Sequence, residues 1–198
     1  MRPGFCLALC VALLLGASAA AQVAYFPPGS LSNDAHGDDF LSDWYSGQLR
    51  ALKEPSLLEL SKKAEAQSYR FLWLRTFHRP VAIRVDVNDD GTALLTTKMT
   101  DGQGGNDPGK LIQNETAALN KAQTHFFLKQ IKEYDFWTLP SAEERAGADG
   151  AEWIVEGVKD GSYHIVSRWS PKDGEIRTIG LFMLHDLAKM KVPAKELY

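Results

Sequence analysis

The segment 69–77, YRFLWLRTF, constrains the fold most strongly because aromatic side chains recur in it with a period of two. Aromatic residues at alternate positions are separated by Leu72 and Leu74, so both faces of an extended chain would be apolar. A strand that is apolar on both faces is buried on both sides. We therefore predict that this segment is a central strand of a sheet.

Further segments with strand character follow at short intervals. VAIRVDV and TALLTTKMT are joined by the turn NDDG, and KLIQNET comes after a glycine-rich loop, DGQGGNDPG. The stretch 149–171, DGAEWIVEGVKDGSYHIVSRWSP, has the pattern of a β-hairpin with a turn at Asp160 and Gly161. Short connections between neighbouring strands favour an antiparallel sheet.

The spacing of apolar residues predicts helices near both ends of the chain and in its middle. Apolar residues recur with helical spacing from Phe40, and a second helix restarts after Pro55. Asn120 and Gln123 form a capping box for a central helix, and 175–190 forms a C-terminal helix. We predict an α+β fold in which two N-terminal helices precede an antiparallel sheet of about six strands. The central and C-terminal helices pack on one face of the sheet, and the other face is free to stay open.

The first residues, MRPGFCLALCVALLLGASAAAQ, have the features of a secretory signal peptide. A positive charge at Arg2 precedes an apolar run, and small residues surround a cleavage position near Ala21. Leu9 stands before Cys10, where a lipobox needs a small residue, so we do not expect lipidation. The predicted boundaries are a signal peptide at 1–21, a flexible leader at 22–39, a helical pair at 40–66 and the α+β domain at 67–198.

The composition of the chain limits the classes of partner that it is expected to bind. Cleavage after residue 21 removes Arg2 alone among the charged residues, which leaves 21 basic against 25 acidic residues and a net charge of −4. This mild acidity argues against nucleic acid, and no second apolar run is long enough to cross a membrane. We expect an exported protein, periplasmic or secreted, that binds an envelope protein, a glycan or a small ligand.

Two motifs have simpler explanations than a bound ion or phosphate. DVNDDG resembles the start of a calcium loop, but position twelve is Thr97 in place of glutamate, and the flanks are strands. GGNDPGKL resembles a phosphate loop, but Leu111 replaces the serine or threonine and a strand follows. The five histidines form no metal-binding spacing and no serine-nucleophile motif occurs, so we expect no metal and no cofactor.

The hairpin is the best candidate for a site. With Lys159 opposite Ser162, its register puts Trp153 across from Arg168 and His164 across from Gly157. This pairing suits a cation–π contact beside a small niche at Gly157, but we favour ordinary sheet packing, with Trp153 beneath a helix and Arg168 and His164 at the edge of that face. Including two residues near the end of the first strand, the candidate binding residues are Arg75, His78, Trp153, Glu156, His164 and Arg168.

Several segments resemble an uncharacterised family of exported bacterial proteins. The resemblance covers about 44–189 and rests on the segments WYSGQLRALKEPSLLEL, SYRFLWLRTFHRPVAIRV, GNDPGKL, FWTLP, the hairpin 149–171 and IGLFMLHDLAK. It implies a coherent exported domain and no assigned activity. The order of elements is also similar to small envelope lipoprotein domains of unknown role.

Two functions follow as hypotheses. The first is a non-catalytic binding or structural domain of the bacterial envelope. The alternative is a hydrolytic enzyme whose site is assembled from dispersed residues, namely His78, Asp149, Glu156, His164 and Arg168. A metal site built from histidines or from the turn at 86–90 is a third, weaker hypothesis.

Overall fold

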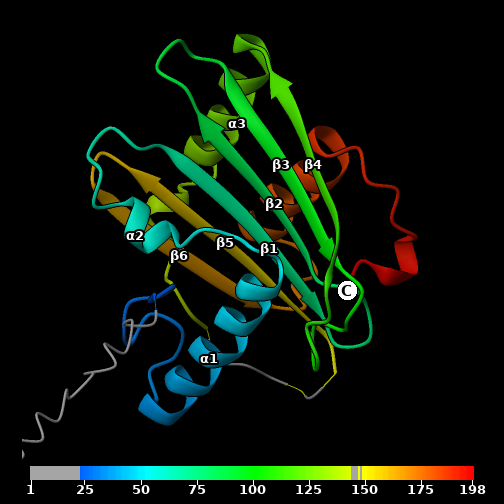
Figure 1. Ribbon diagram of the computed structural model, residues 1–198. Helices are drawn as coiled ribbons and strands as arrows, with labels where there is room; N and C mark the ends of the chain where they lie inside the picture. The colour runs from blue at the N-terminus through cyan, green and yellow to red at the C-terminus, as the bar shows by residue number, and fades with distance from the viewer. Residues whose placement is uncertain (1–22, 144–146, 148) are drawn as a thin grey trace, which may run out of the picture.

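A computed structural model describes residues 23–143, 147 and 149–198. Across these residues the chain forms one six-stranded antiparallel sheet in the order β4-β3-β2-β1-β5-β6 (Figure 1). The predicted α+β fold with an antiparallel sheet is thus confirmed, and the signal peptide predicted at 1–21 lies outside the described residues. The strands are β1 (Ser68–Arg75), β2 (Val81–Val87), β3 (Ala93–Thr100), β4 (Leu111–Leu119), β5 (Ala151–Lys159) and β6 (Ser162–Trp169).

The central position of β1 follows from its composition. Every residue of β1 is buried, and the strand lies between β2 and β5 as its two apolar faces predict. Tyr69, Phe71 and Trp73 face one layer of the core, whereas Leu72 and Leu74 face the other. The sheet therefore separates two hydrophobic layers.

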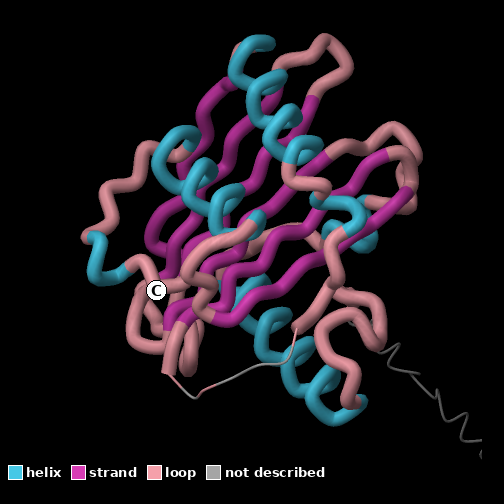
Figure 2. The backbone as a smooth tube through the Cα atoms, turned by 180° about the vertical axis from the view of Figure 1, so that it is seen from behind, coloured by secondary structure: helices cyan, strands magenta, loops and turns pink. Residues whose placement is uncertain are grey.

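The larger core layer lies beneath the central and C-terminal helices, which cross one face of the sheet (Figure 2). The central helix is α3 (Lys121–Glu133), and its capping box between Asn120 and Gln123 is present as predicted. The short helix η1 (Phe136–Thr138) follows it, after Asp135 in the left-handed region at φ 46°. α4 (Glu175–Leu181) continues into η2 (Phe182–Leu187), a π-helical segment that turns both Met183 and Leu184 into the core.

The opposite face of the sheet is partly covered, so the prediction that it stays open is wrong over β1, β5 and β6. α1 (Ala35–Ala51) and the single turn α2 (Leu57–Leu60) lie on this side in Figure 1. Tyr45 and Leu49 of α1 pack with Leu72 of β1 and Ile154 of β5. Toward β3 and β4 this face is exposed at positions such as Leu94.

The segment predicted as a flexible leader is anchored to the fold through three buried residues that begin at Tyr25. Tyr25, Phe26 and Leu31 are buried with the residues of α1. The carboxylate of Asp38 accepts hydrogen bonds from the backbone of Gly29, Leu31 and Ser32, which folds the segment back onto the helix. Three apolar residues among prolines and glycines suffice to anchor this segment. The helix α1 begins at Ala35 rather than at Phe40.

The two turns that attract functional interpretations are structural. Asn88 N–H donates to the Thr92 carbonyl, and the Asp90 carboxylate accepts from Thr92, which closes the β2–β3 hairpin. The loop before β4 is held from α1, since Trp44 Nε1 and Gln48 Nε2 both donate to the Gly104 carbonyl. These hydrogen bonds explain the Asn, Asp and Gly residues of both turns by their structural roles.

No helix in the described part of the chain combines the length and the apolar character that crossing a bilayer requires.

Candidate functional site

The hairpin has the predicted register, but its tryptophan is part of the core. Lys159 pairs with Ser162 and Trp153 with Arg168, and the turn residues Asp160 and Gly161 have positive φ angles of 51° and 75°. The Trp153 side chain is fully buried, packs at a tilt against the rings of Phe71 and Trp73, and donates its indole N–H to the Tyr198 carbonyl. The cation over its ring is Arg177, at 5.1 Å from the ring centroid.

Arg168 and His164 fasten a loop to the outer edge of β6. Arg168 donates to the carbonyl of Pro140 and pairs with Glu143, with Nε 3.0 Å from the carboxylate. His164 Nε2 lies 3.1 Å from the Leu139 carbonyl, and burial lowers the pKa of this imidazole. Both side chains thus hold segment 139–143 against the strand, which is a structural role.

The niche predicted at Gly157 is already filled. A Cβ atom at this position would lie 2.6 Å from the Phe136 ring and 3.1 Å from the Tyr69 ring. Phe136 also contacts the His164 ring, with centroids 5.1 Å apart. Glycine is required here so that Phe136 can lie directly on the sheet, and no space for a ligand remains.

Glu156 lies on the opposite face, in a buried ionic network that sequence reasoning missed. Its carboxylate accepts from Arg70 Nε at 2.8 Å and from Arg70 Nη2 at 2.6 Å, and neither side chain has any exposed surface. Tyr163 donates its hydroxyl to the same carboxylate at 3.0 Å. Burial and the charge of Glu156 raise the pKa of Tyr163 well above its usual value, so this hydroxyl stays protonated.

Glu54 extends this network from the connection between α1 and α2. Its carboxylate is nearly inaccessible and accepts from Arg84 at 3.0 Å and from Arg70 at 3.4 Å, with Lys98 at 2.9 Å. Burial favours a higher pKa for Glu54, but these three cations outweigh it and lower the pKa. The one sequence signal was that Arg70, Arg84 and Lys98 share a face of an otherwise apolar sheet.

Arg75 and His78 do come together, at the end of the sheet where the C-terminal segment returns. Arg75 Nη1 lies 3.1 Å from the Glu196 carboxylate, and His78 Nε2 lies 3.6 Å from it. His78 Nδ1 also lies 2.8 Å from the Tyr198 hydroxyl. Arg75, His78 and Glu196 border a shallow cavity of about 460 Å³.

The dispersed hydrolytic site is not assembled in this fold. His78 lies at the end of β1, Glu156 is buried beneath α2, and His164 is at the edge of β6. Asp149 is exposed in the loop before β5. In the described portion of the chain, moreover, no cluster of three or more His, Asp or Glu side chains is arranged to hold a metal ion.

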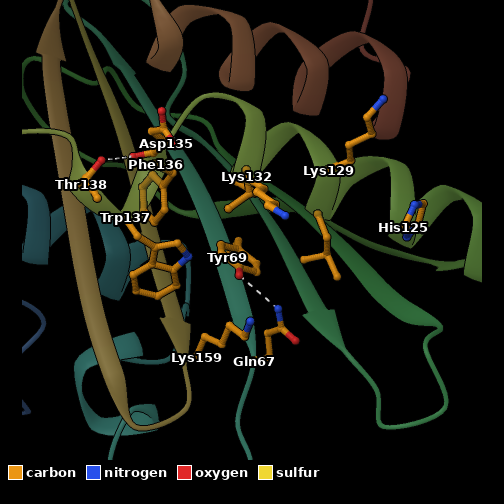
Figure 3. A pocket seen from close by; sticks show the side chains of 12 residues that line it. Gln67, Tyr69, His125, Lys129, Lys132, Asp135, Phe136, Trp137, Thr138 and Lys159 are labelled. Carbon is orange, nitrogen blue, oxygen red and sulfur yellow. Dashed lines mark hydrogen bonds between the residues drawn. The ribbon is translucent and has the colours of Figure 1, made fainter.

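A larger groove, which sequence reasoning did not find, opens between α3, η1 and the start of β1 (Figure 3). Its volume is about 600 Å³. Tyr69 forms the floor, Phe136 and Trp137 form one wall, and Leu128 and Ile131 of α3 contribute apolar surface on the other side. Its polar rim consists of Gln67, His125, Lys129, Lys132, Asp135, Thr138 and Lys159.

The three aromatic rings of the groove hold each other in place. Tyr69 meets Phe136 and Trp137 edge to face, with centroids 6.3 Å and 6.1 Å apart, and Phe136 meets Trp137 at 5.4 Å. The left-handed residue Asp135 ends α3 and reverses the chain, so that both aromatic residues of η1 turn back toward β1. These contacts fix the shape of the groove before any ligand arrives.

Comparison of the chain with known protein families and with curated proteins finds no match. The assignment of a function therefore depends on the residues themselves.

Proposed function

We propose that this chain is a non-catalytic binding protein and that the groove between α3, η1 and β1 is its ligand site. The observation that carries the proposal is the convergence of Tyr69, Phe136 and Trp137 around a concave space of about 600 Å³. Small-molecule sites have volumes of roughly 300–1,000 Å³ and combine apolar walls with a few polar groups. The groove has this size and this composition.

The other clusters of polar residues are better explained by stability. The Arg70–Glu156 network is closed to solvent, and the hairpin residues Trp153 and Arg168 bind other parts of the same chain. The groove differs from them because its aromatic and polar side chains border open space. It is thus the surface best suited to a binding function.

The proposal is tested with the uncharged fluorescent dye N-phenyl-1-naphthylamine. We expect the dye to bind the wild-type protein and to bind the Trp137→Ala variant at least about tenfold more weakly, since a tryptophan in a binding surface is a typical affinity determinant. Phe40→Ala is the matched control, because Phe40 is an exposed aromatic residue of α1 far from the groove. Equal affinity of all three proteins, or no binding at all, would refute the site.

We also propose that the chain is exported, periplasmic or secreted, and belongs to the exported bacterial family that its motifs resemble. The support is the charged, apolar and small-residue order of its first 22 residues. Expression of the full chain in a bacterium, followed by N-terminal sequencing of the exported fraction, tests this. We expect the mature protein to begin at Gln22, and retention of Met1 in the cytoplasm would contradict export.

The alternative function is a hydrolase. Among the predicted site residues, Arg75 and His78 lie together, so an enzymatic site would have to be built around them. His78 lies between the Glu196 carboxylate and the Tyr198 hydroxyl beside the cavity of about 460 Å³. Hydrolysis of 4-nitrophenyl acetate by the wild-type protein and by His78→Ala distinguishes the two functions. We expect the same background rate from both, whereas a rate that depends on His78 would favour the enzyme.

A further inference from the structure

The polar groups of the groove point to one chemical class of ligand. Resting on the binding function proposed above, we propose that the groove takes a small ligand that combines a flat apolar body with an anionic group, such as an aromatic carboxylate or sulfonate. The apolar body would lie against Tyr69, Phe136 and Trp137. The anionic group would lie among Lys132, Lys159 and the Tyr69 hydroxyl.

The Tyr69 hydroxyl is prepared to donate rather than accept. Its oxygen accepts a hydrogen bond from Gln67 Nε2 at 3.1 Å. Within the described residues its own proton has no acceptor, although the side chain is only 1% exposed. Burial and the charge of Asp160 raise the pKa of Tyr69, against hydrogen bonds from Gln67 and Trp137 that lower it, so the proton is retained at neutral pH. A ligand oxygen at the floor of the groove would satisfy this donor.

Two ammonium groups complete the donor set. Lys132 extends from the last turn of α3 and Lys159 from the end of β5, and in Figure 3 both side chains lie around Tyr69. Among the residues that the structure describes, Lys159 has only a distant partner, Asp160 at 3.9 Å, whose side chain is 83% exposed. Exposed pairs of this kind contribute little energy, so Lys159 remains able to bind an anion.

The residues that line the groove include more lysines than carboxylates, although Asp160 lies beside Lys159. Lys129 is paired with Glu133 at 3.3 Å and points away from Tyr69 in Figure 3. Asp135 is the one carboxylate among the residues that line the groove, against three lysines. Hydrogen bonds in which one partner is charged are about twice as strong as neutral ones, so an anion gains more here than a neutral acceptor.

A matched pair of dyes tests this inference. 1-Anilinonaphthalene-8-sulfonate and N-phenyl-1-naphthylamine share the same aromatic body, and only the first carries a sulfonate. We expect the wild-type protein to bind the sulfonate more tightly, and Lys132→Gln combined with Lys159→Gln to weaken the sulfonate about tenfold while changing the neutral dye less than about twofold. Lys110→Gln, an exposed lysine outside the groove, is the control and should bind both dyes as the wild type does.

The outcomes separate the ligand class from the site itself. If the double variant keeps its affinity for the sulfonate while Trp137→Ala weakens both dyes, the groove binds ligands but the anionic preference is wrong. If Trp137→Ala changes neither dye, the groove is not the site and both proposals fall. Unchanged melting temperatures of the lysine variants show that a loss of affinity does not arise from unfolding.

Discussion

Arg70 and Glu156 form an ion pair that is closed to solvent, with Arg70 Nη2 2.6 Å from the Glu156 carboxylate. The two residues lie on adjacent strands, opposite each other in the β1–β5 register. Glu54 brings a second carboxylate to the same guanidinium from the connection between α1 and α2. The network therefore joins the N-terminal helices to the middle of the sheet.

Breaking this pair should be costly. We predict that Arg70→Met lowers the free energy of unfolding by about 3–5 kcal/mol, because Glu156 is left as a buried charge without its partner. Urea denaturation measures the change. Lys62→Met is the control, since Lys62 pairs with Glu59 on the surface and its loss should cost less than about 1 kcal/mol. A loss below 1 kcal/mol for Arg70→Met would mean that the pair does not stabilise the fold.

Glu54 should make the protein sensitive to acid. Its pKa is lower in the folded state than the value of about 4.3 for a free glutamate, because Arg70, Arg84 and Lys98 outweigh its burial. Its contribution is therefore present above about pH 4.3 and is lost as the pH falls through the folded-state pKa. Glu54→Gln should destabilise the protein most at neutral pH, and its difference from the wild type should shrink toward acid pH.

Denaturation curves between pH 3 and pH 7 check this. The control is Glu59→Gln, whose side chain is 43% exposed. A difference between the wild type and Glu54→Gln that is constant with pH would contradict the lowered pKa.

His164 should titrate below the ordinary histidine value. Burial and the charge of Arg168 lower its pKa, against hydrogen bonds from the imidazole to the Leu139 and Phe136 carbonyls. Since the unfolded chain takes up the proton near pH 6.5, the wild type should lose stability as the pH falls below about 6.5, until the folded-state pKa is reached. Titration of the imidazole signals by NMR measures the pKa directly. His164→Gln should remove this part of the pH dependence, whereas His36→Gln, at an exposed position, should keep it.

Two glycines should respond in opposite directions to the same substitution. Gly157→Ala places a Cβ 2.6 Å from the Phe136 ring, so we expect a loss of about 1–3 kcal/mol of stability and weaker dye binding in the groove. A Cβ at Gly47, inside α1, meets nothing within 4 Å. Gly47→Ala should therefore stabilise the protein by about 0.5–1 kcal/mol. Thermal unfolding compares the melting temperatures of the two variants with that of the wild type. An unchanged melting temperature for Gly157→Ala would show that Phe136 is free to move.

The sequence predicted those parts of the fold that depend on local periodicity. The central position of β1, the hairpin register around Asp160 and Gly161, and the capping box at Asn120 all follow from residues close together in the chain. The packed leader was missed because a few buried apolar residues, such as Tyr25, are hidden among turn-forming residues.

The groove could not be predicted because its parts are distant in the sequence. Tyr69, Lys132 and Trp137 come from β1, α3 and η1, and they meet only after the helices pack on the sheet. The sequence favoured core packing for Trp153 but could not exclude a binding patch, for a related reason. A strand pattern shows which side chains share a face, but it does not show which face a helix will cover.

Ligand binding in the groove is tested most directly by titrating the protein with 1-anilinonaphthalene-8-sulfonate. The NMR signals of its five tryptophan indoles report where the ligand binds. Trp137 lines the groove, whereas Trp73 and Trp153 are fully buried in the core. We predict that the Trp137 indole signal shifts with saturation and that those of Trp73 and Trp153 change least. Saturable binding that leaves Trp137 unchanged and shifts the indole of Trp44, on α1, would contradict it.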